Sequence, residues 1–155
     1  GGALAITAAS LTEEISGVAS ISAPSDFRDW AQDPEQLLQY SRTVGAISDP
    51  DFPQDEASWA AEIELIRPVE AAGEMNKKPL LVVHGASDQV VPSFDARVLA
   101  DSHGDADLRI IDGGTHRLRF DPRASAIIIG WLDRTYRLRT KDMTSDQFPI
   151  SQGEL

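Results

Sequence analysis

The chain has 155 residues, of which 41% are hydrophobic and 25% charged, a composition typical of one globular domain that excludes extensive disorder. Its formal net charge of −11 gives a surface that repels phosphate backbones and anionic lipids, so we expect neither nucleic acid nor membrane partners. Because the chain has no cysteine, it can form no disulfide, zinc–thiolate site or thiol nucleophile of its own.

The beginning of the chain predicts a helix followed by a buried strand. Residues 1–10 (GGALAITAAS) are small and apolar, as in the body of a buried helix that starts before Gly1. Residues 15–23 are rich in β-branched side chains and stop at Pro24, which predicts a strand covered on both faces. No basic segment precedes the apolar residues, and no apolar run approaches the about 18 residues that cross a bilayer. We therefore expect a cytoplasmic protein without a signal peptide.

A polar insertion with several aromatic side chains is expected over about residues 25–73. Pro34 is a suitable first-turn residue for a helix over roughly 34–45. Helical spacing continues through 55–73, where Pro68 should kink or interrupt the helix. Four aromatic side chains of the insertion either line an acyl-binding pocket or simply pack the insertion onto the body: Trp30, Tyr40, Phe52 and Trp59.

The rest of the chain alternates strands and helices. Strands are predicted over 79–84 (PLLVVH) and 107–112, and helices over 93–102 and 122–136. The buried side of the last helix is expected to hold four apolar residues: Ile127, Ile128, Trp131 and Leu132. Residues 1–136 would then form the domain, followed by a polar tail over 137–155. This order predicts an α/β fold in which three parallel strands lie side by side in chain order, with helices on both faces of the sheet.

One acidic residue and one histidine come after neighbouring strands of this predicted sheet. Asp88 lies on the short loop after strand 79–84, and His116 lies after strand 107–112 and two glycines. Alone, Asp88 could be a turn cap and His116 a solvated loop residue. Sites of open α/β sheets form beyond the carboxyl ends of the strands, so these two side chains should meet there. We expect Asp88 to hydrogen-bond a ring nitrogen of His116, as a carboxylate does when it orients a catalytic histidine.

The segments HGASDQVVP and GGTHRLRF resemble the acid loop and the histidine loop of the α/β-hydrolase superfamily, of the serine esterase or peptidase-like type. In that family the nucleophile, the acid and the histidine occur in this order along the chain. The opening residues GGALAI resemble the segment just after the serine of G-x-S-x-G, which would place the nucleophile two positions before Gly1. The resemblance covers about residues 1–135 and implies a partial α/β-hydrolase fold, with residues 25–73 in the place of a lid.

The nucleophile is therefore expected outside this chain. None of the serines near Asp88 or near the end of the first strand lies in G-x-S-x-G; these are Ser20, Ser22, Ser25, Ser87 and Ser93. Ser87 and Ser93 are interpreted as a loop residue and a helix N-cap. His84 is interpreted as a packed, hydrogen-bonded core residue and His103 as a solvated loop residue. The three histidines show no metal-ligand spacing, so we expect no metal and no other cofactor.

The resemblance implies a hydrolase of carboxylic esters or thioesters, with His116 as general base and then general acid and Asp88 as its orienter. Two alternatives stay open: a relative with an Asp or Cys nucleophile, of the dehalogenase or dienelactone-hydrolase type, and a non-catalytic binding domain of the same fold. The expected partners are a small acyl substrate and, along the open edge of strand 17–23, either the N-terminal part of the fold or a second copy of the chain. We expect this chain alone to be inactive.

Overall fold

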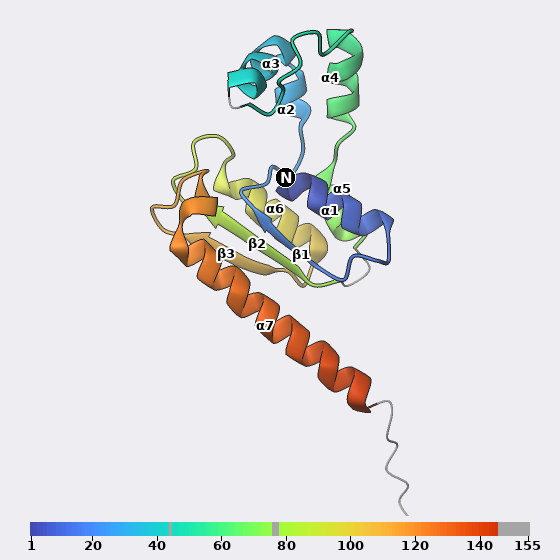
Figure 1. The fold of residues 1–155 in the computed structure, drawn as a ribbon, viewed down its shortest axis with the longest axis vertical. Coiled ribbons are helices and arrows are strands. Elements are labelled where there is room, and N and C mark those ends of the chain that lie inside the picture. The colour runs from blue at the N-terminus through green and yellow to red at the C-terminus, as the bar shows by residue number, and fades with distance from the viewer. Residues whose placement is uncertain (44, 76–77, 146–155) are drawn as a thin grey trace, which may run out of the picture.

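The computed structural model describes residues 1–43, 45–75 and 78–145, with side chains described up to residue 137. Three parallel strands form one sheet in the order β1-β2-β3 (Figure 1), and these are β1 (Val18–Ile21), β2 (Leu80–Gly85) and β3 (Asp107–Ile111). Val18 of β1 pairs with Leu80, and Leu81 of β2 pairs with Asp107. The predicted α/β class and strand order are confirmed.

Helices cover both faces of this sheet, as predicted. On one face lie α1 (Gly2–Leu11), α5 (Pro68–Gly73) and α6 (Ser93–His103), and on the other lies α7 (Pro122–Ser145) (Figure 1). Every residue of β2 is buried, because Leu80 and Val82 pack in the first layer and Leu81 and Val83 in the second. The central strand is thus held from both sides, which fixes the position of the loop after it.

Helix α1 packs closely against the end of β1. Its buried residues Ala3, Ile6 and Ala9 recur every three positions, so one side of the helix faces the sheet. A Cβ atom at Gly2 would lie 2.6 Å from the Oγ of Ser20, so this contact needs a glycine. The first turn of α1 therefore lies at the carboxyl end of β1, on the same rim as the loops after β2 and β3.

Helix α7 is longer than the sequence predicts. It begins at Pro122 as expected but continues past 136 to Ser145, so the first part of the expected tail is helical, and residues 146–155 lie outside the described residues. Trp131 is buried, with Ile127 and Ile128 partly buried around it. Leu132 is 53% exposed, so its predicted burial is wrong. The helix turns Leu132 away from a sheet that covers only one side of it.

The insertion folds into a small helical lobe after the carboxyl end of β1. It contains α2 (Arg28–Ala31), α3 (Pro34–Thr43) and α4 (Glu56–Glu64) and stands apart from the sheet (Figure 1). The proline at position 68 interrupts the helical pattern as predicted, because it opens the separate helix α5, which packs against α1 and α6 in the body. The part of 25–73 that leaves the sheet is therefore the stretch before α5. No helix in the described part of the chain is long and apolar enough to cross a membrane.

Candidate active site

The structure brings Asp88 and His116 together at the carboxyl rim of the sheet. Asp88 lies three residues after β2 and His116 five residues after β3. The Nδ1 atom of His116 lies 2.9 Å from Oδ2 of Asp88, and this geometry assigns the proton to Nδ1, which donates to the carboxylate. The expected hydrogen bond is present, and His116 Nε2 has no hydrogen-bond partner among the described residues. With its side chain 35% exposed, His116 can present Nε2 to a reacting group.

The carboxylate of Asp88 is fully buried and held at both oxygens. Its Oδ1 accepts hydrogen bonds of 2.9 Å from the backbone N–H groups of Val90 and Val91, and its Oδ2 accepts from His116. Burial by itself would raise the pKa of Asp88. The N–H groups of Val91 and Val90 and the contact with His116 outweigh burial and hold this pKa below its ordinary value. Asp88 is therefore a fixed negative charge that orients His116.

Two glycines let the acid loop and the histidine loop touch. The N–H of Ala86 donates to Ile111 and that of Ser87 donates to Gly114, at 2.9 and 2.8 Å. A Cβ atom at Gly85 would lie 2.2 Å from the carbonyl oxygen of Gly114, which no side chain tolerates. The backbone thus sets the distance between Asp88 and His116.

A third polar side chain, His84, lies at this site, although the sequence predicts only a packed histidine there. His84 is fully buried at the end of β2, and its Nε2 lies 3.0 Å from the carbonyl oxygen of Val91. The expected hydrogen bond is therefore present. The same nitrogen also lies 3.2 Å from Oδ2 of Asp88, a contact that sequence reasoning missed. The sequence feature that could have predicted this contact is the spacing of four residues between His84 and Asp88 across a tight turn.

The other histidine and two of the serines weighed in the sequence have local contacts of their own. The expectation of a solvated His103 is wrong, because its Nε2 lies 2.9 Å from the carbonyl oxygen of Lys78 and its Nδ1 accepts from the N–H of Asp105. Ser93 is the first residue of α6, whose N-cap is Pro92, so the predicted cap lies one residue too late.

Ser22 comes directly after β1, with a φ of 49° and a buried Oγ that has no hydrogen-bond partner in the described structure.

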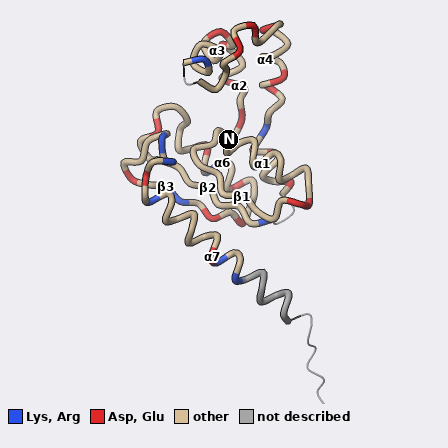
Figure 2. Tube along the Cα trace, in the orientation of Figure 1, with Lys and Arg blue, Asp and Glu red and all other residues tan. Residues whose placement is uncertain are grey.

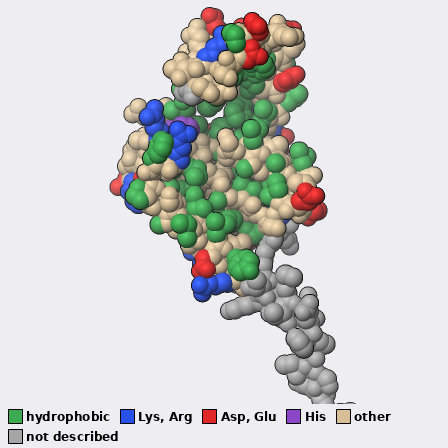
Figure 3. All heavy atoms as spheres, viewed as in Figure 1, with side chains coloured by type: hydrophobic (Ala, Val, Ile, Leu, Met, Phe, Trp, Pro, Cys, Tyr) green, Lys and Arg blue, Asp and Glu red, His purple; other side chains and the backbone are tan. Residues whose placement is uncertain are grey.

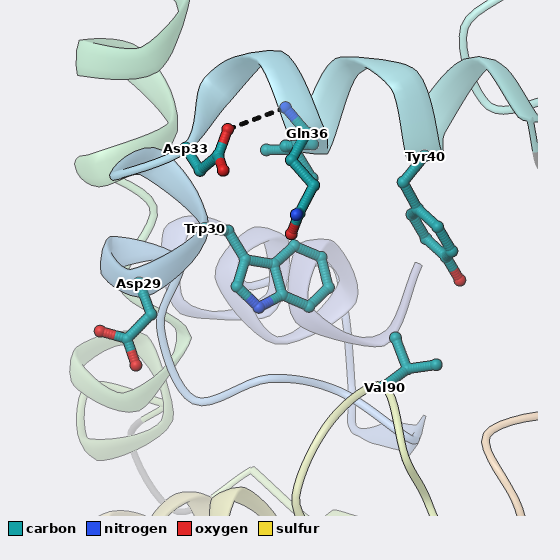
Figure 4. Close-up of a pocket in the computed structure, with 7 residues that line it drawn as sticks. Asp29, Trp30, Asp33, Gln36, Tyr40 and Val90 are labelled. Carbon is teal, nitrogen blue, oxygen red and sulfur yellow. Dashed lines mark hydrogen bonds between the residues drawn. The ribbon is translucent and has the colours of Figure 1, made fainter.

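A cavity of about 350 Å³ lies between the lobe and the acid loop. Trp30 and Tyr40 line it from the lobe and Val90 from the acid loop, together with Asp29, Asp33, Gln36 and Leu37 (Figure 4). Figure 3 shows the hollow between the two parts of the molecule, with a histidine and basic side chains at its edge. The other two aromatics of the insertion, Phe52 and Trp59, pack edge to face at 5.9 Å. Two of the four aromatic candidates therefore line a cavity and two pack together.

No cluster of three or more histidine, aspartate or glutamate side chains that could hold a metal ion occurs in the described part of the chain. What the arrangement can do chemically is transfer a proton at His116 Nε2, with the buried Asp88 stabilising the positive charge that forms. It places no nucleophile in a G-x-S-x-G turn, since that pattern is absent from the sequence.

A parallel sheet with helices on both faces and an acid–histidine pair beyond its strand ends defines the α/β-hydrolase class of fold. Solved structures superpose accordingly. The esterase domain of a Rhodothermus marinus protein matches with a TM-score of 0.60 at 20% identity, over 86% of this chain and 57% of its own length. An α/β-hydrolase enzyme from the sediment metagenome of the Mar Chica lagoon, Morocco, matches with a TM-score of 0.60 at 18% identity, over 87% and 58%.

The meta-cleavage product hydrolase from Pseudomonas fluorescens matches with a TM-score of 0.61 at 19% identity, over 87% of this chain and 62% of its own length. The sequence matches no protein-family model and no curated protein. The chain spans about three fifths of the length of these solved structures. It therefore has part of the α/β-hydrolase fold, as the resemblance of its loops implied.

Proposed function

We propose that this chain carries the acid and the base of a hydrolase that cleaves carboxylic esters or thioesters. The observation that carries the proposal is the hydrogen bond between His116 Nδ1 and the buried carboxylate of Asp88 at the carboxyl rim of the sheet. The likeness in fold to an esterase domain and to other hydrolases supports it. The nucleophile is proposed to lie two positions before Gly1, on the resemblance of the opening glycines to the end of a nucleophile turn.

In this proposal His116 Nε2 takes the proton of the nucleophile's hydroxyl as its oxygen attacks the substrate carbonyl. Asp88 stabilises the resulting imidazolium, and His116 then gives the proton to the departing alcohol or thiol. A water molecule repeats the sequence on the acyl-enzyme and releases the acid. Backbone N–H groups hold the oxyanion in each step.

The cavity under the lobe is proposed to bind the acyl part of the substrate. Trp30 and Tyr40 offer ring surfaces and Val90 an aliphatic one, which suits an apolar or aromatic group. Because Val90 also donates its N–H to Asp88, a substrate in this cavity lies beside the acid loop. The two side chains Asp29 and Asp33 at the cavity wall favour a neutral substrate over one with a carboxylate there.

The test uses the longer protein in which this chain is preceded by its nucleophile segment. We expect p-nitrophenyl ester hydrolysis, and covalent labelling by a fluorophosphonate two positions before Gly1. Asp88→Asn and His116→Ala should each lower kcat by about 10⁴-fold. His103→Gln is the matched control, because His103 contacts Lys78 rather than the site, and it should retain activity.

Two results would replace this proposal. A glycine or alanine at the labelled position, with no turnover, would favour the non-catalytic binding domain, and an aspartate or cysteine would favour the other hydrolase types. The chain of 155 residues by itself should show neither turnover nor labelling. Saturable activity of that chain, abolished by His116→Ala and accompanied by labelling of one of its serines, would show that the nucleophile lies within it.

A further inference from the structure

His84 is the buried polar side chain at the centre of the site that the proposed reaction does not use. It lies on the middle strand with no exposed surface. Its Nε2 lies between the carbonyl oxygen of Val91, at 3.0 Å, and Oδ2 of Asp88, at 3.2 Å. Both neighbours are acceptors, so the contact is favourable only when Nε2 carries a proton.

The surroundings of the other ring nitrogen show which nitrogen carries the proton. Nδ1 of His84 is buried and has no hydrogen-bond partner in the described structure. A buried N–H without an acceptor is costly, whereas an imidazole nitrogen without a proton is a weaker loss. The geometry therefore assigns the ring proton of His84 to Nε2.

The proton on Nε2 of His84 lies between two acceptors of the acid loop. Val91 accepts from His84 at its carbonyl oxygen and donates from its N–H to Oδ1 of Asp88, so the two bonds are made by the peptide groups on either side of its Cα atom. The other carboxylate oxygen, Oδ2, then lies between the Nε2 of His84 and the Nδ1 of His116. His84 thus contacts both Val91, the residue whose N–H binds one oxygen of Asp88, and the other oxygen of Asp88, which binds His116.

We propose that His84 is a positioning residue, whose Nε2–H holds the backbone of Val91 and the carboxylate of Asp88 in the orientation in which Asp88 accepts the hydrogen bond of His116. The effect of His84 on catalysis rests on the proposed function, whereas its hydrogen bonds follow from the distances alone. Loss of the donor should let the backbone at Val91 shift, which would weaken the N–H bond to Oδ1 and let Oδ2 turn away from His116. A core residue that only fills space would have none of these effects.

Two substitutions distinguish the loss of the hydrogen-bond donor from the loss of side-chain volume. In His84→Gln the amide nitrogen can reach about the position of Nε2, whereas in His84→Asn the shorter side chain places its amide near Nδ1. NMR of the chain monitors the proton on Nδ1 of His116 by its exchange with water. We expect His84→Asn to accelerate this exchange by about tenfold and His84→Gln to leave it within about threefold of the unmodified chain.

The tautomer of His84 is measured on the unmodified chain by long-range ¹H–¹⁵N correlation, so the proposal stays testable if a variant does not fold. A proton on Nδ1 in place of Nε2 would overturn it. Equal exchange rates in the two variants would also overturn it, because they would reduce His84 to a packing residue. None of these measurements needs substrate turnover, so they can fail or succeed independently of the proposed hydrolase activity.

Discussion

Gly85 controls the site without contributing a functional group to it. It lies between His84 and the acid loop, and its Cα faces the peptide that leads into His116, with the nearest backbone atom at Gly114. Backbone packed this closely cannot move aside as a flexible side chain can. The distance between Asp88 and His116 therefore depends on the absence of a single methyl group.

Gly85→Ala should separate the two loops and weaken the bond between Asp88 and His116. We expect the free energy of unfolding to fall by about 1–3 kcal/mol, as for overpacking elsewhere. Gly130→Ala in α7 is the matched control. Its added methyl group would come no closer than 3.5 Å to another side chain, so it should be neutral or stabilise by up to about 1 kcal/mol. Urea unfolding measures both, and an equal effect of the two substitutions would contradict the role of close loop contact.

At the scale of elements, the end of α1 is capped by a residue far away in the sequence. The last turn of α1 has no basic residue of its own. The ammonium group of Lys78 lies 2.9 Å from the carbonyl oxygen of Ala9 and 2.7 Å from that of Thr12. Lys78 is buried, and its nearest carboxylate is that of Glu13, at 3.6 Å. Its charge thus stabilises the carboxyl end of the helix and joins it to the start of β2.

Lys78→Met should remove this cap while keeping most of the aliphatic chain. The expected loss is about 1–3 kcal/mol of unfolding free energy, because buried carbonyl groups lose a charged donor. Arg97→Met on the exposed side of α6 serves as the control and should change stability by less than about 0.5 kcal/mol. Chemical denaturation gives both values, and the idea of a cap fails if Lys78→Met is as mild as the control.

At the scale of the whole molecule, β1 forms an edge of the sheet. The N–H groups of Val18 and Ser22 donate to Pro79 and Val83 on the β2 side. By the alternation of a strand, those of Ala19 and Ile21 point the other way, where the described structure has no further strand. Acidic side chains are spread over both the lobe and the body (Figure 2). We propose that the rest of the fold, or a second copy of the chain, pairs there.

Ala19→Pro tests this proposal, because it removes an N–H from the free edge. We expect the isolated chain to associate, and this substitution to shift it toward a monomer in size-exclusion chromatography with light scattering. Ser20→Pro, one residue on, is the counterpart: it removes an N–H from the β2 side and should unfold the sheet. A wild-type chain that is a stable monomer and unfolds cooperatively would contradict the proposed pairing.

Local patterns were enough to predict the three strands, the longer helices and the acid–histidine pair. The apolar run 79–84, the glycines before His116 and the proline at 68 each act within a few residues of themselves, so their effects can be read along the chain. The C-terminal end of α7 and the exposure of Leu132 could not be predicted in this way. They depend on how far the sheet extends under the helix, which no local pattern contains.

The order of strands and helices, and the placement of Asp88 and His116 at strand ends, were determined by the sequence itself, because hydrophobic periodicity and turn residues act locally. Beyond that pair, only the tertiary structure decided which distant groups meet. The contact of Lys78 with Ala9 joins residues 69 positions apart, and the cavity joins Trp30 to Val90. Such contacts depend on the packing of whole elements, since a side chain's partner is set by where the backbone carries it.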